Sequence, residues 1–252
     1  MSSSLLEMKN LHFQYGKEAI FEDLSLQVNQ EEFVSVIGPS GSGKTTLFRL
    51  ITGLEAPQQG EVLLQGKAVT SAGGRIGYMP QRDQLMPWRT ILENVILPLE
   101  LQGIRKKEAC EKALPLLASF GLEGTEHSYP GELSGGMRQR VSFLRAYLTG
   151  AEVLLLDEPF SALDAITRLS MQEWLTAQWT KWKKTIIFIT HDLDEALFLS
   201  DRVFVTSTPP MTSLKELQIP LARPRTMEDV NDPSLLQVKR ELLRQFRAEG
   251  VL

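Results

Sequence analysis

A glycine-rich run, GPSGSGKTT at residues 38–46, constrains this chain more than any other feature of its sequence. It follows the apolar run FVSVI and precedes LFRLIT, whose apolar residues recur at helical spacing. This order predicts a buried strand, a loop and a helix. Glycines let backbone N–H groups converge on an anion, and a helix N-terminus adds a favourable partial charge. The spacing matches the phosphate-binding pattern G-x-x-x-x-G-K-[ST], so we expect the loop to hold nucleotide phosphates.

Individual residues of this loop have distinct expected roles. Lys44 can reach the β and γ phosphates, and the Thr45 hydroxyl can bind Mg²⁺. A Gly/Ser turn that merely caps a helix is the alternative, and the strand-loop-helix context makes it the less favoured one. The expected ATP-binding residues of the loop are Gly38, Pro39, Ser40, Gly41, Ser42, Gly43, Lys44, Thr45 and Thr46.

Two acidic residues, Asp157 and Glu158, follow the apolar run VLLL at 153–156. An apolar run without alternation is typical of a strand covered on both faces, as in a parallel sheet. At the end of such a strand Asp157 can hold Mg²⁺, and Glu158 can polarise a water molecule for attack on the γ phosphate. Without the phosphate loop, two solvated acids would be the better interpretation.

A second glycine-containing helix start lies at LSGGM, residues 133–137, before RQRVSFLRAYL. Its N-terminus offers another anion site, and its glycines permit close approach. A simple helix cap, which Ser and Gly also make well, is the alternative.

The order of strand and helix signals along the rest of the chain predicts an α/β fold whose sheet is mostly parallel. Between residues 81 and 150 strand signals vanish, and Thr90-Ile-Leu-Glu93 and Ser134 mark helix starts. A mixed-charge amphipathic stretch at 234–248 predicts a closing helix. Further strands are expected at 61–64, 75–79, 185–189 and 202–206.

We therefore expect three parts. They are a nucleotide-binding α/β core at 1–81 and 151–208, with an antiparallel β part near the N-terminus, an inserted helical subdomain at 82–150, and a C-terminal extension at 209–252 that packs on the core.

Composition narrows the class of protein. The 252 residues are 42% hydrophobic, which suits one or two compact domains. With 27 Lys and Arg against 31 Asp and Glu, no strong basic field exists, so nucleic acid is not an expected partner. The one cysteine, Cys110, indicates a reducing, cytosolic environment. We also expect neither a secretory signal nor a membrane-spanning segment.

Taken in order, the phosphate loop, LSGGM, VLLLDEP and SALD resemble an ATP-binding cassette ATPase, and the resemblance covers about residues 5–207. It implies that Tyr15 stacks on adenine and that Gln81 senses Mg²⁺ and water. It also implies that Asp164 belongs to the D-loop and that His191 is the switch histidine at the γ phosphate. Each has an ordinary alternative by itself: packing for Tyr15, a solvated loop residue for Gln81, and a residue before the cap Asp192-x-x-Glu195 for His191.

The resemblance implies a complete ATPase site with MgATP. Members of the family bind two ATP molecules between two head-to-tail copies, so Ser134, Gly135 and Gly136 are expected to act on the ATP of a second copy of this chain. Met137 stands where many members carry glutamine, which puts in question a contact by that side chain. The implied catalytic residues are Glu158, His191 and Gln81, and the implied metal ligands are Thr45, Gln81 and Asp157.

Four segments, MPWRT, PFSALDAITR, THDLDEALFLSDRV and LARPR, are similar to the nitrate/sulfonate/taurine importer branch, which includes importers of pyrimidine precursors. This implies a peripheral subunit on the cytoplasmic face of the cell membrane that hydrolyses ATP to drive uptake of a small solute. The implied partners are an integral-membrane permease and, through it, an extracytoplasmic substrate-binding protein. The expected permease contact is the region from Arg82 to Leu101, which carries the apolar residues Leu85, Met86, Pro87 and Trp88. Packing of Trp88 and Leu85 within the helical subdomain is the alternative.

Three other functions stay open. A non-transport cassette ATPase, such as a DNA-repair or assembly factor, is disfavoured by the acidic pI and by the absence of a coiled-coil or zinc insertion. A phosphate-loop kinase or GTPase is a second alternative, but it would not explain the closely spaced motifs of residues 134–164. The sequence also lacks the N-K-x-D motif by which GTPases recognise guanine. A nonhydrolytic adaptor would be excluded by measurable MgATP turnover.

Overall fold

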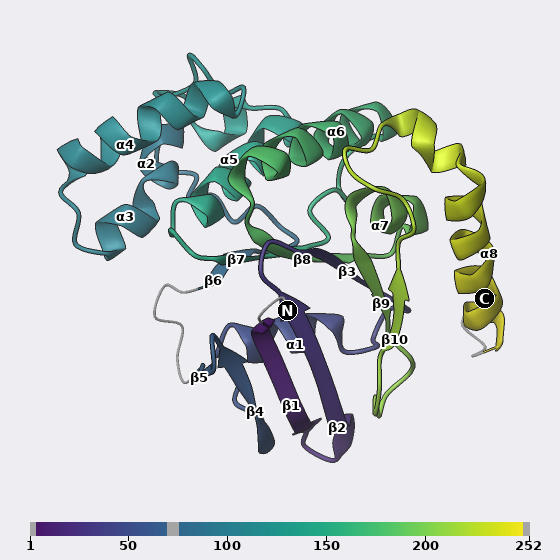
Figure 1. Ribbon diagram of the computed structural model, residues 1–252. Helices are drawn as coiled ribbons and strands as arrows, with labels where there is room; N and C mark the ends of the chain where they lie inside the picture. Colours follow the sequence, from purple (N-terminus) through teal and green to yellow (C-terminus); the bar gives the residue numbers. More distant parts are fainter. Residues whose placement is uncertain (1–3, 70–75, 249–252) are drawn as a thin grey trace. The chain divides into compact units, whose positions relative to one another are not determined.

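The computed structural model describes residues 4–69 and 76–248 (Figure 1). The chain forms two compact units, the first made of Met1–Ala72 with Gln172–Leu252 and the second of Gly73–Met171. The three-part division expected from the sequence stays a prediction. No helix within the described residues is long and apolar enough to cross a membrane.

An antiparallel sheet forms the N-terminal part of the first unit, as predicted. Its strand order is β2-β1-β4-β5. In the β1-β2 hairpin Phe13 pairs with Phe21, and buried residues alternate with exposed ones over much of β2. This alternation is typical of a sheet with one solvated face. The strands are β1 (Ser4–Tyr15), β2 (Glu18–Asn29), β4 (Gln59–Leu64) and β5 (Lys67–Ala68).

A buried, mostly parallel set of strands carries the rest of the first unit. Strand β3 lies between β8 and β9 and runs parallel to both, with Phe33 opposite Ile186 and Val34 opposite Arg202. Every residue of β3 and β8 is buried, which explains why their sequences show no polar alternation. The strands are β3 (Phe33–Ile37), β8 (Thr185–Thr190), β9 (Arg202–Val205) and β10 (Lys215–Gln218), which is antiparallel to β9.

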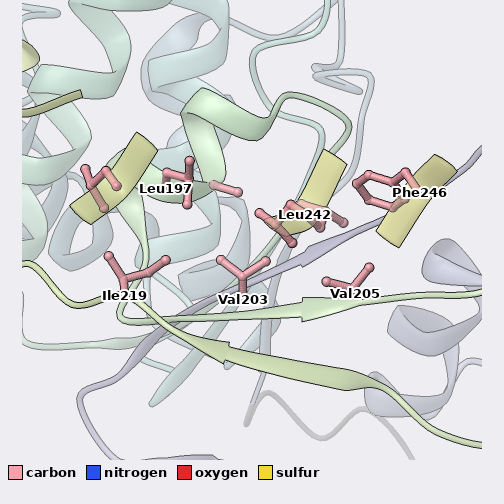
Figure 2. Packing of buried hydrophobic residues seen from close by; sticks show 9 residues of the cluster. Leu197, Val203, Val205, Ile219, Leu242 and Phe246 are labelled. Carbon is pink, nitrogen blue, oxygen red and sulfur yellow. The ribbon is translucent and has the colours of Figure 1, made fainter. Parts of the chain in front are cut away.

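Helices α1 (Lys44–Ile51) and α7 (Leu193–Leu199) follow β3 and β8, respectively. The predicted closing helix is confirmed as α8 (Pro233–Ala248), and a 3₁₀ turn, η2 (Met227–Asn231), precedes it. Figure 2 shows Leu242 and Phe246 of α8 over Val203 and Val205 of β9. This apolar cluster holds the C-terminal helix on the first unit.

The second unit combines two parallel strands with short helices. Both predicted helix starts are confirmed. Thr90 and Glu93 form a capping box, and Ser134 caps the helix that carries LSGGM. The elements are β6 (Ile76–Met79), α2 (Ile91–Val95), α3 (Leu97–Leu101), α4 (Lys106–Ser119), η1 (Pro130–Glu132), α5 (Gly135–Tyr147), β7 (Val153–Asp157) and the start of α6 (Ala165–Trp182). The strand predicted at 75–79 begins at Ile76, and residue 75 lies outside the described residues.

A buried ion-pair network joins the two sheets of the first unit. The side chain of Arg202, 10% exposed, donates to both carboxylate oxygens of Glu32 at 2.9 Å and to the carbonyl oxygen of Gln27. It also donates to Glu216 of β10 at 2.7 and 2.9 Å. Burial alone would lower the pKa of Arg202, but the hydrogen bonds to Glu216 and Glu32 raise it. The hydrogen bond from Arg202 lowers the pKa of Glu216.

We expect Arg202→Met to lower the free energy of unfolding by about 3 kcal/mol, because it leaves the buried Glu32 carboxylate without its cation. Urea denaturation measures the loss. Lys9→Met, which removes a half-exposed partner of Glu7, is the control and should cost less than about 1 kcal/mol. Equal losses for the two variants would contradict this assignment.

Candidate functional site

The predicted phosphate loop joins β3 to α1 in the first unit. Gly43 is the N-cap of α1, and because glycine has no side chain, this position gives the first-turn N–H groups no side-chain cap. Lys44 Nζ donates to the carbonyl oxygens of Gly38 at 3.0 Å and Pro39 at 2.7 Å. The ammonium group therefore lies within the curve of the loop, as a phosphate cradle requires.

Gly38 permits a close approach between the loop and the residue after β9. A Cβ atom at position 38 would lie 1.8 Å from Thr206 Oγ1. Thr206 Oγ1 lies 2.7 Å from Ser42 Oγ and donates to the carbonyl oxygen of Ile37. Any larger residue at position 38 would push the loop away from this support.

Part of the loop is open to solvent. Ser40, Gly41 and Thr45 are exposed, whereas Ser42 and Lys44 are buried. Tyr15, at the end of β1, is also exposed, and its ring packs edge-on against Phe13 with centroids 4.8 Å apart. The exposure leaves ring surface available for stacking.

His191 follows β8 directly, and the residues on both sides of it, Thr190 and Asp192, form hydrogen bonds. Asp192 caps α7 by accepting the N–H groups of Asp194 at 2.8 Å and Glu195 at 3.2 Å, which confirms the predicted cap. The buried Glu195 carboxylate accepts from Thr190 Oγ1 at 2.6 Å. The last residue of β8 is thus tied to the first turn of α7.

The structure brings His191 and the phosphate loop together. His191, Gly38, Pro39 and Ser40 line one pocket of about 280 Å³. The other lining residues are Ile37, Leu193, Leu243 and Phe246.

In the second unit, Gln81 and Glu158 are also brought together. Gln81 Nε2 donates to Glu158 Oε2 at 2.9 Å. Asp157, buried at the end of β7, accepts from the Tyr78 hydroxyl at 3.2 Å. Glu158 has a φ of 44°, a left-handed conformation that costs a non-glycine residue about 1 kcal/mol or more. Its carbonyl oxygen accepts from the N–H and hydroxyl of Ser161, which hold this turn.

The LSGGM and SALD segments meet at one threonine of α6. A Cβ atom at Gly136 would lie 2.8 Å from Thr167 Cγ2. Thr167 Oγ1 donates to Asp164 Oδ2 at 2.6 Å, and this bond is the main cause that lowers the pKa of Asp164. Ser134 Oγ accepts from the N–H of Met137 at 3.3 Å, and the Ser134 side chain is exposed.

The segment after Gln81 is organised by polar contacts. Asp83 accepts from Arg138 through its carboxylate and from Arg145 through its carbonyl oxygen. The fully buried Asn94 donates to the carbonyl oxygens of Met86, Arg89 and Thr90 and accepts from the N–H of Met86. Of the apolar residues expected to be exposed here, Trp88 is 74% exposed, but Leu85 is 8% exposed. The expectation for Leu85 was wrong because its side chain packs into the unit.

The predicted residues divide between the two units. Tyr15, residues 38–46 and His191 belong to the first, whereas Gln81, Ser134, Gly135, Gly136, Asp157, Glu158 and Asp164 belong to the second.

Sequence reasoning missed three supporting residues: Tyr78, Thr167 and Thr206. Each contacts a predicted residue that is distant in sequence: Tyr78 contacts Asp157, Thr167 contacts Gly136, and Thr206 contacts Ser42. No local pattern marks such a contact.

The donor types fit Mg²⁺ that arrives with a nucleotide. Mg²⁺ usually keeps several water molecules and takes one or two carboxylates plus substrate phosphates. Thr45 offers an exposed hydroxyl and Asp157 a carboxylate. Within residues 4–69 and 76–248 there is no cluster of three His, Cys, Asp or Glu side chains that could hold a metal ion by itself.

Comparison with known proteins decides the family. The family model "ABC transporter" matches residues 21–161, which is more than half of the chain. The chain belongs to the ABC transporter family. It is an ATPase of that family, and the fold and enzyme class predicted from the sequence are confirmed.

Relatives of this ABC ATPase match it over nearly its whole length. The formylaminopyrimidine import ATP-binding protein ThiZ of Halalkalibacterium halodurans is 48% identical, over 98% of this chain and 97% of the relative. The aliphatic sulfonates import ATP-binding protein SsuB 1 of Rhodococcus jostii is 45% identical, over 94% of this chain and 91% of the relative. Among solved structures, the dimeric ATP-binding cassette MJ0796, in a post-hydrolysis state bound to ADP and Pi, is 29% identical with a TM-score of 0.73. The match covers 86% of this chain and 100% of that one.

We expect Gly136→Ala to lower the free energy of unfolding by about 1–3 kcal/mol, because its methyl group would overlap Thr167 Cγ2. Adding Thr167→Ser should restore most of the loss, since serine lacks the methyl group but keeps the hydroxyl that binds Asp164. Urea unfolding of the single and double variants tests this. Gly131→Ala is the control, because a Cβ atom there meets nothing within 4 Å. A double variant no more stable than Gly136→Ala alone would count against the overlap.

Proposed function

We propose that this chain is the ATP-hydrolysing subunit of an importer that takes up a small solute through a separate membrane permease. The observation that carries the proposal is the 48% identity with the formylaminopyrimidine import ATP-binding protein over 98% of the chain. A solute of the pyrimidine-precursor class is therefore the first candidate. A sulfonate or taurine-like solute is the second, because import ATP-binding proteins for sulfonates and taurine are 45% and 41% identical.

In this proposal the first unit binds the triphosphate. Lys44 exchanges its hydrogen bonds with the loop carbonyls for the β and γ phosphate oxygens, while the N–H groups at the start of α1 donate to the same phosphates. Tyr15 stacks on adenine, and His191 donates to the γ phosphate from the pocket that it shares with the loop.

The second unit supplies the hydrolytic residues. Glu158 orients a water molecule and accepts its proton, and Gln81 holds the Glu158 carboxylate through the 2.9 Å hydrogen bond. Thr45, Gln81 and Asp157 are the proposed ligands of Mg²⁺, which neutralises phosphate charge when it is bound.

A second copy of the chain completes each site. Ser134 is exposed at the start of α5, where Gly135 is partly exposed and Gly136 is buried; in this proposal Ser134, Gly135 and Gly136 bind a partner's phosphate at this helix N-terminus. The dimeric form of the solved relative bound to ADP and Pi supports this arrangement. ATP binding then closes the dimer, and hydrolysis reopens it.

The proposed permease contact is the segment around Trp88 in the helical subdomain, residues 82–150. Trp88 is largely exposed, and the buried Asn94 fixes the backbone on both sides of it. A large apolar ring held on an ordered loop is suited to a partner's pocket. The chain would lie peripherally on the cytoplasmic face of the membrane, with a substrate-binding protein on the other side.

Glu158→Gln tests the hydrolytic assignment. We expect MgATP turnover to fall by about 100-fold or more, while ATP still binds and a dimer accumulates, as measured by light scattering. Glutamine keeps the shape of the side chain but cannot accept the proton. Glu123→Gln, at an exposed position, is the charge-matched control. Turnover at the wild-type rate in Glu158→Gln would refute the role of Glu158.

Purification from mildly solubilised native membranes tests the transport assignment. We expect a multispan permease as a stoichiometric partner in mass spectrometry. Trp88→Ala should reduce the recovered permease, whereas Leu101→Ala, another exposed apolar position, should not. ATPase stimulation of the reconstituted complex by the binding protein loaded with formylaminopyrimidine, taurine or an alkanesulfonate then identifies the solute class. Only soluble or nucleic-acid partners would instead favour a non-transport ATPase.

A further inference from the structure

The LARPR segment, residues 221–225, has no part in the site described so far, and it lies outside the residues that the family model matches. Its second arginine, Arg225, is 5% exposed. Buried arginines are rare unless their donors are satisfied. The hydrogen bonds of the Arg225 side chain therefore indicate its structural role.

Arg225 caps the C-terminal end of α7. Its Nη1 donates to the carbonyl oxygens of Leu197 and Phe198, both at 3.1 Å, and of Ser200 at 2.5 Å. Its Nε and Nη2 donate to the carbonyl oxygen of Leu221. The last carbonyl groups of a helix lack partners within the helix and carry partial negative charge, so a cation stabilises them.

Arg223 reaches the same helix end. It donates to the carbonyl oxygen of Leu199 and to Asp201 Oδ1 at 2.6 Å. Its guanidinium carbon also lies 4.2 Å from the centroid of the Trp179 ring. Burial, and then the charge of Arg223, lower the pKa of Arg225 to about 10, so Arg225 remains charged at neutral pH.

Lys239 of α8 holds the other end of α7. Its Nζ lies 2.6 and 2.8 Å from the carboxylate oxygens of Asp194, in the first turn. Between these ends, Leu242 of α8 belongs to the same apolar cluster as Leu197 of α7 (Figure 2). The cluster also contains Ile37, the last residue before the phosphate loop. The C-terminal segment thus contacts α7 at both ends and along its side.

We propose that Arg223, Arg225 and Lys239, which we name the C-terminal clamp, position His191 for the γ phosphate by fixing α7. His191 is two residues before α7, and it lines one pocket with Gly38 to Ser40. A shift of α7 would change the distance between His191 and the loop. Displacing a catalytic group by about 1 Å can cost about 100-fold in rate. This inference rests on the proposed role of His191.

Arg225→Gln is the main test, measured as steady-state MgATP turnover of the purified full-length dimer. We expect kcat to fall by about 10-fold with the KM for ATP changed less than about 2-fold, because the phosphate loop itself stays intact. Arg225→Lys should be intermediate, since lysine keeps the charge but not the fork of donors. Arg244→Gln, which removes an exposed arginine from α8, is the matched control and should behave as wild type.

A double-variant cycle separates positioning from simple stabilisation. If Arg225 acts through His191, Arg225→Gln should cause no further loss of kcat in a His191→Ala background. Losses that multiply would overturn the clamp proposal while leaving the role of His191 intact. A His191→Ala variant with the wild-type kcat would instead refute the proposed role of His191.

If Arg225→Gln fails to fold, two variants that each remove one surface ion pair test the proposal instead. Lys239→Gln removes the ion pair from α8 to Asp194 of α7, and Lys215→Gln removes the ion pair from β10 to Glu241 of α8. Both pairs tie α8 to a neighbouring element at the surface. We expect only Lys239→Gln to lower kcat, by about 2-fold, and not in the His191→Ala background. Equal effects of the two variants would overturn the clamp.

Discussion

The first unit depends on one constraint: a buried strand must deliver a glycine-rich loop, with no side-chain cap at Gly43, to the start of a helix. Strand β3 meets this constraint because it is buried and paired in parallel with β8 and β9. Thr206, directly after β9, supports the loop at Gly38, and Lys44 lies within its curve. His191, directly after β8, lines a pocket with the same loop. The neighbouring strands thus bring their C-terminal ends to one place, which is where ligands bind in open α/β sheets.

The second unit positions the two acidic residues of the proposed site through hydrogen bonds. Asp157 accepts a hydrogen bond from the Tyr78 hydroxyl and Glu158 accepts one from the Gln81 amide, so a polar partner orients each carboxylate. The left-handed φ of Glu158 shows that local strain is tolerated where this side chain must be presented. Thr167 links Gly136 to Asp164, so the LSGGM helix start and the SALD segment are held as one piece.

The C-terminal segment connects the fold to the proposed chemistry. Two buried arginines beside each other carry a desolvation cost, which the lowered pKa of Arg225 reflects. The capped carbonyl groups of α7 offset that cost and fix the helix that follows His191. An importer ATPase must couple closure to hydrolysis, and the proposed role of His191, just before a firmly held helix, suits this requirement.

The sequence by itself determined the α/β class, the strand-loop-helix around Lys44, the helix starts at Thr90 and Ser134, and the family, because these are local patterns of periodicity, capping and motif spacing. The roles of the individual site residues stay predictions. Only the tertiary structure decided that Leu85 is buried while Trp88 is exposed, that β10 pairs as an edge strand, and that Thr206, Thr167 and Arg225 support the motifs. These contacts join residues that are far apart along the chain or lack a distinctive local pattern, so packing alone brings them into contact.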